Sequence, residues 1–199
     1  MTDTLLPKPK FRSACSVEAS LRERRSVREF RAASLSLASV GQLLWAAQGL
    51  TASTGERTAP SAGGLYPLEL YLVAGSVEQV APGVYRYDPR GHRLRLHCSG
   101  DRRRALGGAA LGQSAVTGAP AILVVVAVYG RTSAKYGSRG DRYVHMEVGH
   151  AAQNIYLEAQ SLGLGTVIIG AFKDERVRDV LELPPSESPL ALLPVGARQ

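Results

Sequence analysis

The feature that most constrains how this chain folds is an uninterrupted apolar run over residues 121–128, AILVVVAV, in which β-branched side chains dominate. A strand with apolar side chains on both faces has to be covered on both faces, so this run predicts a central strand of a sheet. Residues 143–162 predict the longest helix, because apolar side chains recur there at three- and four-residue steps and Gly163 supplies a stop. A covered strand and an amphipathic helix together predict an α+β fold.

The rest of the chain alternates between short helical and strand patterns, with no internal repeat. Helices are predicted at 16–25, from 36 or 39 to 48, at 101–113 and at 174–181, and strands at 68–74, 84–87, 93–96, 166–169 and 190–195. The turn of the 84–96 hairpin contains Pro89, which sets φ, and Gly91, which allows positive φ. Residues 51–60 and 131–142 are predicted as loops. We therefore expect a mixed sheet with helices packed around it, in one domain over residues 16–199 that is preceded by an N-terminal arm at 1–15.

The charge of the chain favours anionic partners. Its 24 Lys and Arg residues against 17 Asp and Glu residues give a formal net charge of +7, which attracts phosphates, nucleic acids and acidic surfaces. The arginines are scattered apart from a run at 102–104, and aromatic residues make up only 6% of the chain and do not cluster with them. A nucleic-acid groove combines a basic stripe with aromatic side chains. We expect no nucleic-acid partner, and a basic nucleic-acid-binding module without enzymatic activity stays as the alternative from another functional class.

Patterns for metals, disulfides and membranes are weak. Cys15 and Cys98 are far apart and form no CxxC, so we expect two reduced thiols and no zinc site. His145 and His150 are five residues apart, whereas a metal pair on one helix face needs a spacing of about four. The apolar run at 121–128 is too short to cross a bilayer, and the first residues lack the layout of a signal peptide. We expect a cytoplasmic protein with no metal and no membrane partner.

Three separated segments carry residues suited to a flat, phosphate-bearing ligand. The first, RRSVREF at 24–30, offers guanidinium groups and a serine hydroxyl near a helix end, and guanidinium groups bind phosphate well. The second, PSAGGLYP at 60–67, precedes a strand, and its two glycines permit a close backbone approach to a planar ligand. The third, GLGTVIIGAF at 163–172, follows the long helix and ends in small residues. Taken singly, these segments are also typical of a solvated basic helix end, a turn and a buried strand end.

In this order and with these gaps, the three segments resemble the nitroreductase-like flavoprotein family, and the resemblance covers residues 24–196. The resemblance implies an α+β fold with a mixed, mainly antiparallel sheet flanked by helices. It also implies an FMN-dependent oxidoreductase that works as a homodimer, with FMN at the subunit interface. Hydride would pass between the substrate and N5 of the flavin, while the protein orients the ring.

The same resemblance implies which residues contact the cofactor. The first segment would contact the phosphate, the ribityl chain and the ring edge through Arg24, Arg25, Ser26 and Arg28. The neighbouring subunit would contribute Pro60, Ser61, Ala62, Gly63, Gly64 and Leu65. The third segment would place backbone groups near N5 through Gly170 and Ala171, with Ile169 packing on the ring. Gln113 would reach the pyrimidine edge, where an amide both donates and accepts, and Arg198 would contact the phosphate.

The variant PSAGGLYP is similar to one branch of the family, the SagB-type azoline dehydrogenases, which oxidise thiazolines and oxazolines in modified peptides. That branch uses a Lys-Tyr pair as the base that removes a ring proton, and Lys135 and Tyr136 match the pair, although such a pair is also common on a surface. Neither group is a base at its reference pKa, so burial or a nearby charge, such as that of Arg131, Arg139 or Arg142, has to lower the pKa of the lysine. The alternative is an NAD(P)H-dependent nitro- or quinone reductase with a ping-pong mechanism. The substrate is accordingly a small molecule or a modified peptide.

Overall fold

The computed structural model describes residues 3–199, through which one sheet of seven strands runs. The strands lie in the order β1-β4-β3-β2-β5-β7-β6, and each of the six neighbouring pairs is antiparallel. Their bounds are β1 (Asp3–Leu5), β2 (Leu68–Ala74), β3 (Gly83–Asp88), β4 (Arg93–Ser99), β5 (Ala121–Ala127), β6 (Leu164–Thr166) and β7 (Ser188–Ala197). Within the described residues, parallel pairing occurs only in isolated bridges, such as that of Ser26 with Thr166.

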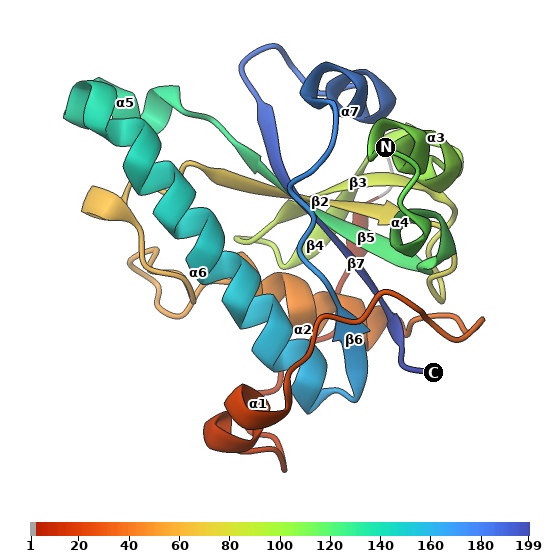
Figure 1. The fold of residues 1–199 in the computed structure, drawn as a ribbon. Coiled ribbons are helices and arrows are strands. Elements are labelled where there is room, and N and C mark those ends of the chain that lie inside the picture. The colour runs from red at the N-terminus through yellow and green to blue at the C-terminus, as the bar shows by residue number, and fades with distance from the viewer. Residues whose placement is uncertain (1–2) are drawn as a thin grey trace.

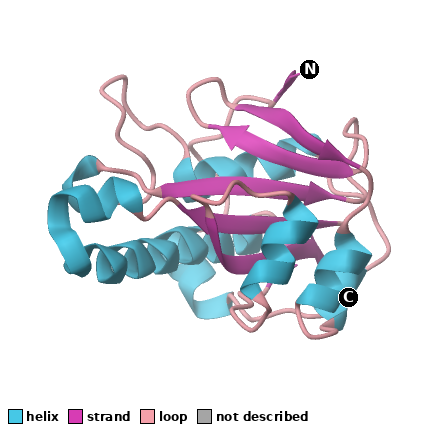
Figure 2. Ribbon diagram, turned by 90° about the horizontal axis from the view of Figure 1, so that it is seen from above, coloured by secondary structure: helices cyan, strands magenta, loops and turns pink. Residues whose placement is uncertain are grey.

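Helices cover both faces of this sheet, as Figures 1 and 2 show. On one face, α2 (Leu37–Gln48) and α6 (Gly140–Ser161) share a core with β2 and β5. On the other face, α3 (Arg103–Ala109), α4 (Ser114–Gly118) and α7 (Asp174–Leu181) share a second core. The remaining elements are α1 (Val17–Glu23), α5 (Gly130–Tyr136) and the 3-10 turns η1 (Ala62–Gly64) and η2 (Gly137–Arg139). The predicted α+β class, with an antiparallel sheet flanked by helices, is confirmed.

The central strand β5 explains this two-sided layering. Successive side chains of a strand point to opposite faces of the sheet. Leu123 and Val125 join the core beneath α2 and α6, whereas Ile122 and Val124 join the core beneath α3, α4 and α7. Every residue of β5 is buried. The prediction of a strand covered on both faces is confirmed.

The long helix α6 packs one face on the first core and ends at a glycine. Its side chains Val144, Val148, Ile155 and Ala159 point into the first core, and Gly163 ends the helix with a φ of 70°, the left-handed conformation that favours glycine. The helix begins at Gly140, three residues before the predicted start. Among residues 3–199, no helix is both long enough and apolar enough to span a membrane.

Three predicted elements differ from the structure. Residues 131–142, predicted as a loop, form most of α5, the turn η2 and the first turn of α6. The helix predicted at 101–113 ends at Ala109, because Leu111 and Gly112 have φ of 59° and 76°, which no α-helix accommodates, and α4 follows. The strand predicted at 166–169 lies two residues earlier, in β6.

The hairpin between β3 and β4 turns by a different device from the predicted one. The Asp88 carboxylate accepts hydrogen bonds from the backbone N–H groups of Arg90 (3.1 Å) and Gly91 (3.3 Å), which closes the turn. Positive φ falls on His92, at 41°, and not on Gly91. The backbone conformation at position 91 therefore does not require glycine.

The N-terminal arm contributes an edge strand. Within the predicted arm at 1–15, residues 1 and 2 lie outside the described residues, and β1 pairs with β4, placing Thr4 opposite Leu94. Further along, the Gln42 side chain of α2 bonds the backbone of Lys10 through both its amide atoms, at 2.8 Å and 3.0 Å. These contacts fix the arm against the body of the protein.

Candidate functional site

The arginine-rich segment at 24–30 lies beside β6. α1 ends at Glu23, and the chain then runs extended alongside the strand, where the backbone N–H of Val27 donates to the Thr166 carbonyl oxygen at 2.9 Å. A Cβ at Gly165 would lie 2.7 Å from the Cβ of Val27, so the close approach requires glycine at that position. The first and third predicted segments are thus neighbours in space.

Tyr156 of α6 ties these two segments together. Its hydroxyl lies 3.1 Å from Ser26 Oγ and accepts a hydrogen bond from the backbone N–H of Ile168 at 2.9 Å. The Arg24 guanidinium lies over the same ring, 5.2 Å from its centroid. Sequence reasoning missed Tyr156, although its place next to Ile155 in the buried stripe of the longest helix could have identified it.

The third segment presents open backbone beside one exposed apolar side chain. Gly170 and Ala171 are exposed, and the Gln113 side-chain amide donates to the Ala171 carbonyl oxygen at 3.0 Å. Ile169, predicted to pack on the ring, is only 5% exposed and its backbone pairs with β7, whereas Ile168 is 42% exposed. Of these two isoleucines, only Ile168 therefore has a side chain open to solvent.

Four predicted arginines have the donor chemistry of a phosphate site. Within residues 3–199, no carboxylate lies within ion-pair distance of Arg24, Arg25, Arg28 or Arg198. Arg198 already donates from Nε to the Leu164 carbonyl oxygen at 2.9 Å and from Nη2 to the Gln160 side chain, so fewer of its donors are free. Guanidinium groups without a carboxylate partner fit the phosphate of the predicted FMN.

The second segment meets the Lys-Tyr pair at the other end of α6. Gly63 in η1 has a φ of 64°, and a Cβ there would lie 2.7 Å from the Tyr136 hydroxyl oxygen and 3.0 Å from Lys135 Nζ. Lys135 Nζ lies 5.4 Å from the centroid of the Tyr136 ring, which packs edge-to-face on Tyr143 at 5.1 Å. Lys135 is exposed and Tyr136 half-buried, and α5 presents both beside the turn formed by Ala62, Gly63 and Gly64. The structure therefore brings together two features that the sequence separates by about seventy residues.

A buried carboxyl group lies beneath this turn. Glu147 is 2% exposed, and its Oε1 has no hydrogen-bond partner. Burial raises the pKa of Glu147 to about 7, against the opposing effects of the Ser61 hydroxyl and the Arg57 charge. The carboxyl lines a cavity of about 240 Å³ together with Pro60, Ser61, Ala62, Tyr143, Met146 and His150.

Sequence reasoning missed the burial of Glu147, although a signal was present. The residue lies three positions after Val144 and four before Ala151, both of which are buried, so helical periodicity places it in the buried stripe of α6. A charged residue in such a stripe is rare unless it is paired or neutral. That exception could have singled it out.

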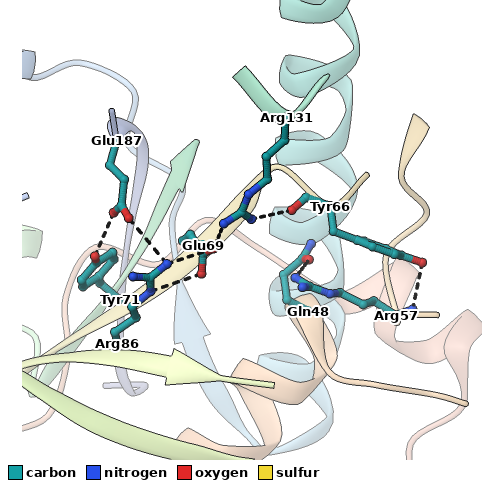
Figure 3. Close-up of polar contacts among 8 residues, drawn as sticks. All are labelled: Gln48, Arg57, Tyr66, Glu69, Tyr71, Arg86, Arg131 and Glu187. Carbon is teal, nitrogen blue, oxygen red and sulfur yellow. Dashed lines mark hydrogen bonds and ion pairs between the residues drawn. The ribbon is translucent and has the colours of Figure 1, made fainter. Parts of the chain in front are cut away.

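The PSAGGLYP segment continues into β2, where ion pairs hold it (Figure 3). The Ser61 hydroxyl accepts from the backbone N–H of Tyr66 at 2.8 Å, and Arg131 of α5 donates to the Tyr66 carbonyl oxygen at 2.9 Å. Arg131 also pairs with Glu69 of β2. These contacts position Leu65 and its neighbours relative to Lys135, which lies one turn after Arg131 on α5.

The predicted residues thus form two half-sites near opposite ends of α6. Half-site A contains the first and third segments around Tyr156, and half-site B contains the second segment, Lys135 and Tyr136 around Tyr143. Thirteen residues separate Tyr143 from Tyr156, which is roughly 20 Å along a helix axis. In Figure 1, α5 lies at one end of α6 and α1 lies at the other. Among residues 3–199, no group of three or more His, Cys, Asp or Glu side chains is placed to hold a metal ion.

Comparison with known proteins identifies what the chain is similar to. Residues 21–197 match the Nitroreductase family. A protein of Methanocaldococcus jannaschii, provisionally named nitroreductase MJ1384, is 47% identical over 182 residues, which cover 92% of this chain and 91% of the relative.

Two solved structures extend the comparison. A Ralstonia eutropha protein provisionally described as a nitroreductase superposes with a TM-score of 0.86 at 31% identity, over 99% of this chain and 90% of that one. A chain of the Escherichia coli microcin synthetase McbBCD complex, solved with truncated pro-MccB17 bound, superposes with a TM-score of 0.77 at 25% identity, over 98% of this chain and 78% of that one.

Proposed function

Because this chain belongs to the nitroreductase family, we propose that it is an oxidoreductase that binds FMN in a site shared between two copies of the chain. The observation that carries the proposal is the division of the predicted cofactor residues between half-site A and half-site B. A non-enzymatic nucleic-acid-binding module, the alternative from the charge of the chain, does not fit membership of an enzyme family.

The residues of half-site A, together with Gln113 beside Ala171, offer charges and hydrogen-bonding groups that match the phosphate and the ring of FMN. Bound FMN supplies a carrier of hydride at N5. Arg24, Arg25 and Arg28 would neutralise the phosphate, since no carboxylate of the described chain competes for them. The Gln113 amide nitrogen already donates to the carbonyl oxygens of Ala110 and Ala171, so its oxygen is the atom left to accept from the pyrimidine edge.

A homodimer would complete the site. In a two-fold dimer, the same patch of each chain faces its partner, so half-site B of one copy can meet half-site A of the other. Each dimer would then hold two composite sites, and neither copy alone would surround the cofactor. The separation of the half-sites along α6 supports this arrangement.

For the reaction we propose dehydrogenation of an azoline ring in a modified peptide. Such a dehydrogenation removes one hydride, which passes to the flavin, and one proton, which passes to the protein. Lys135 and Tyr136 would take the proton, because they flank Gly63 in the half-site that completes the cofactor pocket. The similarity to the McbBCD chain, solved with pro-MccB17 bound, supports a peptide substrate.

A second candidate is reduction of nitro compounds or quinones with NAD(P)H as electron donor. It is favoured by the 47%-identical relative, whose provisional name is that of a nitroreductase. In that case the exposed Lys135 would have no proton to remove, and its substitution would leave the rate unchanged. This contrast separates the two candidates.

The test follows the flavin absorbance in the absence of oxygen. Protein loaded with FMN is mixed with a thiazoline-containing peptide in one cuvette and with NADPH or NADH in another. Bleaching by the peptide that is lost in Lys135→Gln and Tyr136→Phe, but kept in the control Lys173→Gln at another exposed lysine, supports azoline dehydrogenation. Bleaching by NAD(P)H alone supports the reductase. A protein that takes up no FMN contradicts both.

A further inference from the structure

An arginine-lined pocket adjoins half-site B, whose Leu65 and Tyr66 form part of the pocket lining. It opens between the loop after α2, the β3–β4 hairpin and the first turn of α5, and it has a volume of about 670 Å³, within the range of small-molecule sites. Six of its lining residues are arginines: Arg57, Arg86, Arg90, Arg93, Arg95 and Arg131. Only two lining residues, Glu69 and Asp88, are acidic.

Carboxylates hold four of these arginines in place. Glu69 pairs with Arg86 at 3.0 Å and also with Arg131, as Figure 3 shows. Asp88 pairs with Arg93 at 2.9 Å and with Arg95 at 2.8 Å. Two carboxylates outside the lining add to these pairs, because Glu187 lies 3.6 Å from Arg86 and Asp3 lies 3.0 Å from Arg93. The four paired arginines are therefore matched by four carboxylates, and the excess positive charge of the pocket rests on the other two arginines. The groups are fixed in place before any ligand arrives, which lowers the entropic cost of binding.

The remaining two arginines have no acidic partner. No carboxylate in residues 3–199 lies within ion-pair distance of Arg57 or Arg90. Arg57 stacks on the Tyr66 ring at 4.7 Å and donates to Gln48 at 2.9 Å, while its buried Nε has no partner. Arg90 is exposed at the rim of the pocket. Positive charge in a concave site concentrates the field and draws in anions.

We propose that this pocket binds a phosphate-bearing small molecule with two or more negative charges, beside half-site B and in addition to the flavin. Phosphate matches the excess charge better than a single carboxylate does, because one group carries up to two charges and three acceptor oxygens for planar guanidinium donors. Leu50, Leu65 and Pro89 give the pocket an apolar wall beside the stacked Tyr66 ring. That wall suits a ligand with a flat or apolar part, such as the base of a nucleotide.

The test is calorimetric titration of the FMN-saturated protein, in which the flavin phosphate site is already filled. The probes are ADP, inorganic pyrophosphate and citrate at equal ionic strength. We expect ADP and pyrophosphate to bind, with Arg90→Gln weakening both by about fivefold and Arg57→Gln by about tenfold or more. The matched control Arg104→Gln, at an exposed arginine of α3 that does not line the pocket, removes the same charge and should change the affinity less than about twofold.

The outcomes are distinct. Tighter binding of ADP than of pyrophosphate supports a nucleotide ligand, and equal binding supports a phosphorylated ligand without a base. The proposal is overturned if citrate binds as tightly as pyrophosphate, if Arg104→Gln weakens binding as much as Arg90→Gln, or if no probe binds below about 1 mM. A chain that took up no FMN would still carry this pocket, so failure of the proposed function and failure of this proposal are read separately.

Discussion

Glu147 should make the stability of this protein fall as the pH rises. The carboxyl is 2% exposed with one oxygen unpartnered, and burial raises its pKa from 4.5 to about 7. A group whose pKa is higher in the folded than in the unfolded chain holds its proton more tightly when folded. Its contribution to stability is therefore fully present below the unfolded pKa and is lost as the pH rises through the folded pKa.

The size of the effect follows from the two pKa values. Each unit of difference corresponds to about 1.4 kcal/mol, so the rise from 4.5 to about 7 predicts a loss of about 3 kcal/mol between pH 4 and pH 8. In Glu147→Gln the side chain has nearly the same shape but no charge at any pH. The unfolding free energy of the variant should therefore not show this decrease between pH 4 and pH 8.

The assay is urea unfolding of wild type, Glu147→Gln and Glu78→Gln at about pH 4 and about pH 8, at one protein concentration. Glu78 is exposed and has no ion pair among the described residues, so its variant controls for loss of a carboxyl group as such. The quantity compared is the change in unfolding free energy from about pH 4 to about pH 8. For Glu147→Gln this change should be about 3 kcal/mol more favourable than for wild type, and for Glu78→Gln it should differ from wild type by less than about 0.5 kcal/mol. A parallel pH dependence of wild type and Glu147→Gln would refute the reasoning, because it would mean that the carboxyl ionises as it does in water.

Two further predictions concern the half-sites. Gly63→Ala and Gly64→Ala both place a side chain at a positive φ, which costs about 1 kcal/mol in each variant. They differ in their surroundings, because a Cβ at Gly63 meets the Tyr136 hydroxyl whereas a Cβ at Gly64 meets nothing within 4 Å. Gly63→Ala should therefore be the less stable variant in urea unfolding, and adding Tyr136→Phe should narrow the difference; equal stabilities would count against the contact. Tyr156→Phe leaves the Ile168 N–H without its partner and should lose about 1–2 kcal/mol, whereas Tyr143→Phe, whose hydroxyl has no hydrogen bond among the described residues, should stay within about 0.5 kcal/mol of wild type.

Periodicity predicted the elements that organise the fold. The apolar run of β5 extends over all seven residues of the strand, and the apolar stripe of α6 extends over at least two helical turns. In both elements the local sequence pattern agrees with the burial seen in the structure. The same reasoning failed for α5, whose residues Gly130, Arg131, Thr132 and Ser133 show no apolar stripe. That helix depends on tertiary packing: Thr132 is buried, and Gly140 of α6 lies so close that a Cβ there would be 2.9 Å from the Ser133 nitrogen.

The candidate site could be predicted only in pieces. The sequence indicates which segments are special, but the contact between Gly63 and Lys135 depends on how α5 packs beside η1. The exchange of Ile169 for Ile168 as the exposed side chain follows from the pairing of Ile169 with Leu192 in β7, which no local pattern encodes. The family resemblance already implied that the second segment acts from a neighbouring subunit, whereas the spacing of the two half-sites along α6 is visible only in the structure.

The most direct test of a cofactor site shared between two chains is FMN binding by a mixed dimer. One copy carries Arg24→Gln and Arg25→Gln in half-site A, the other carries Gly63→Val in half-site B, and two different affinity tags isolate the heterodimer. Each variant alone should bind no FMN, whereas the heterodimer combines one intact half-site A with one intact half-site B and should bind about half as much FMN as the wild-type dimer. A heterodimer that binds no FMN, while wild type binds it, would mean that both halves of the site lie within one chain and would contradict the account.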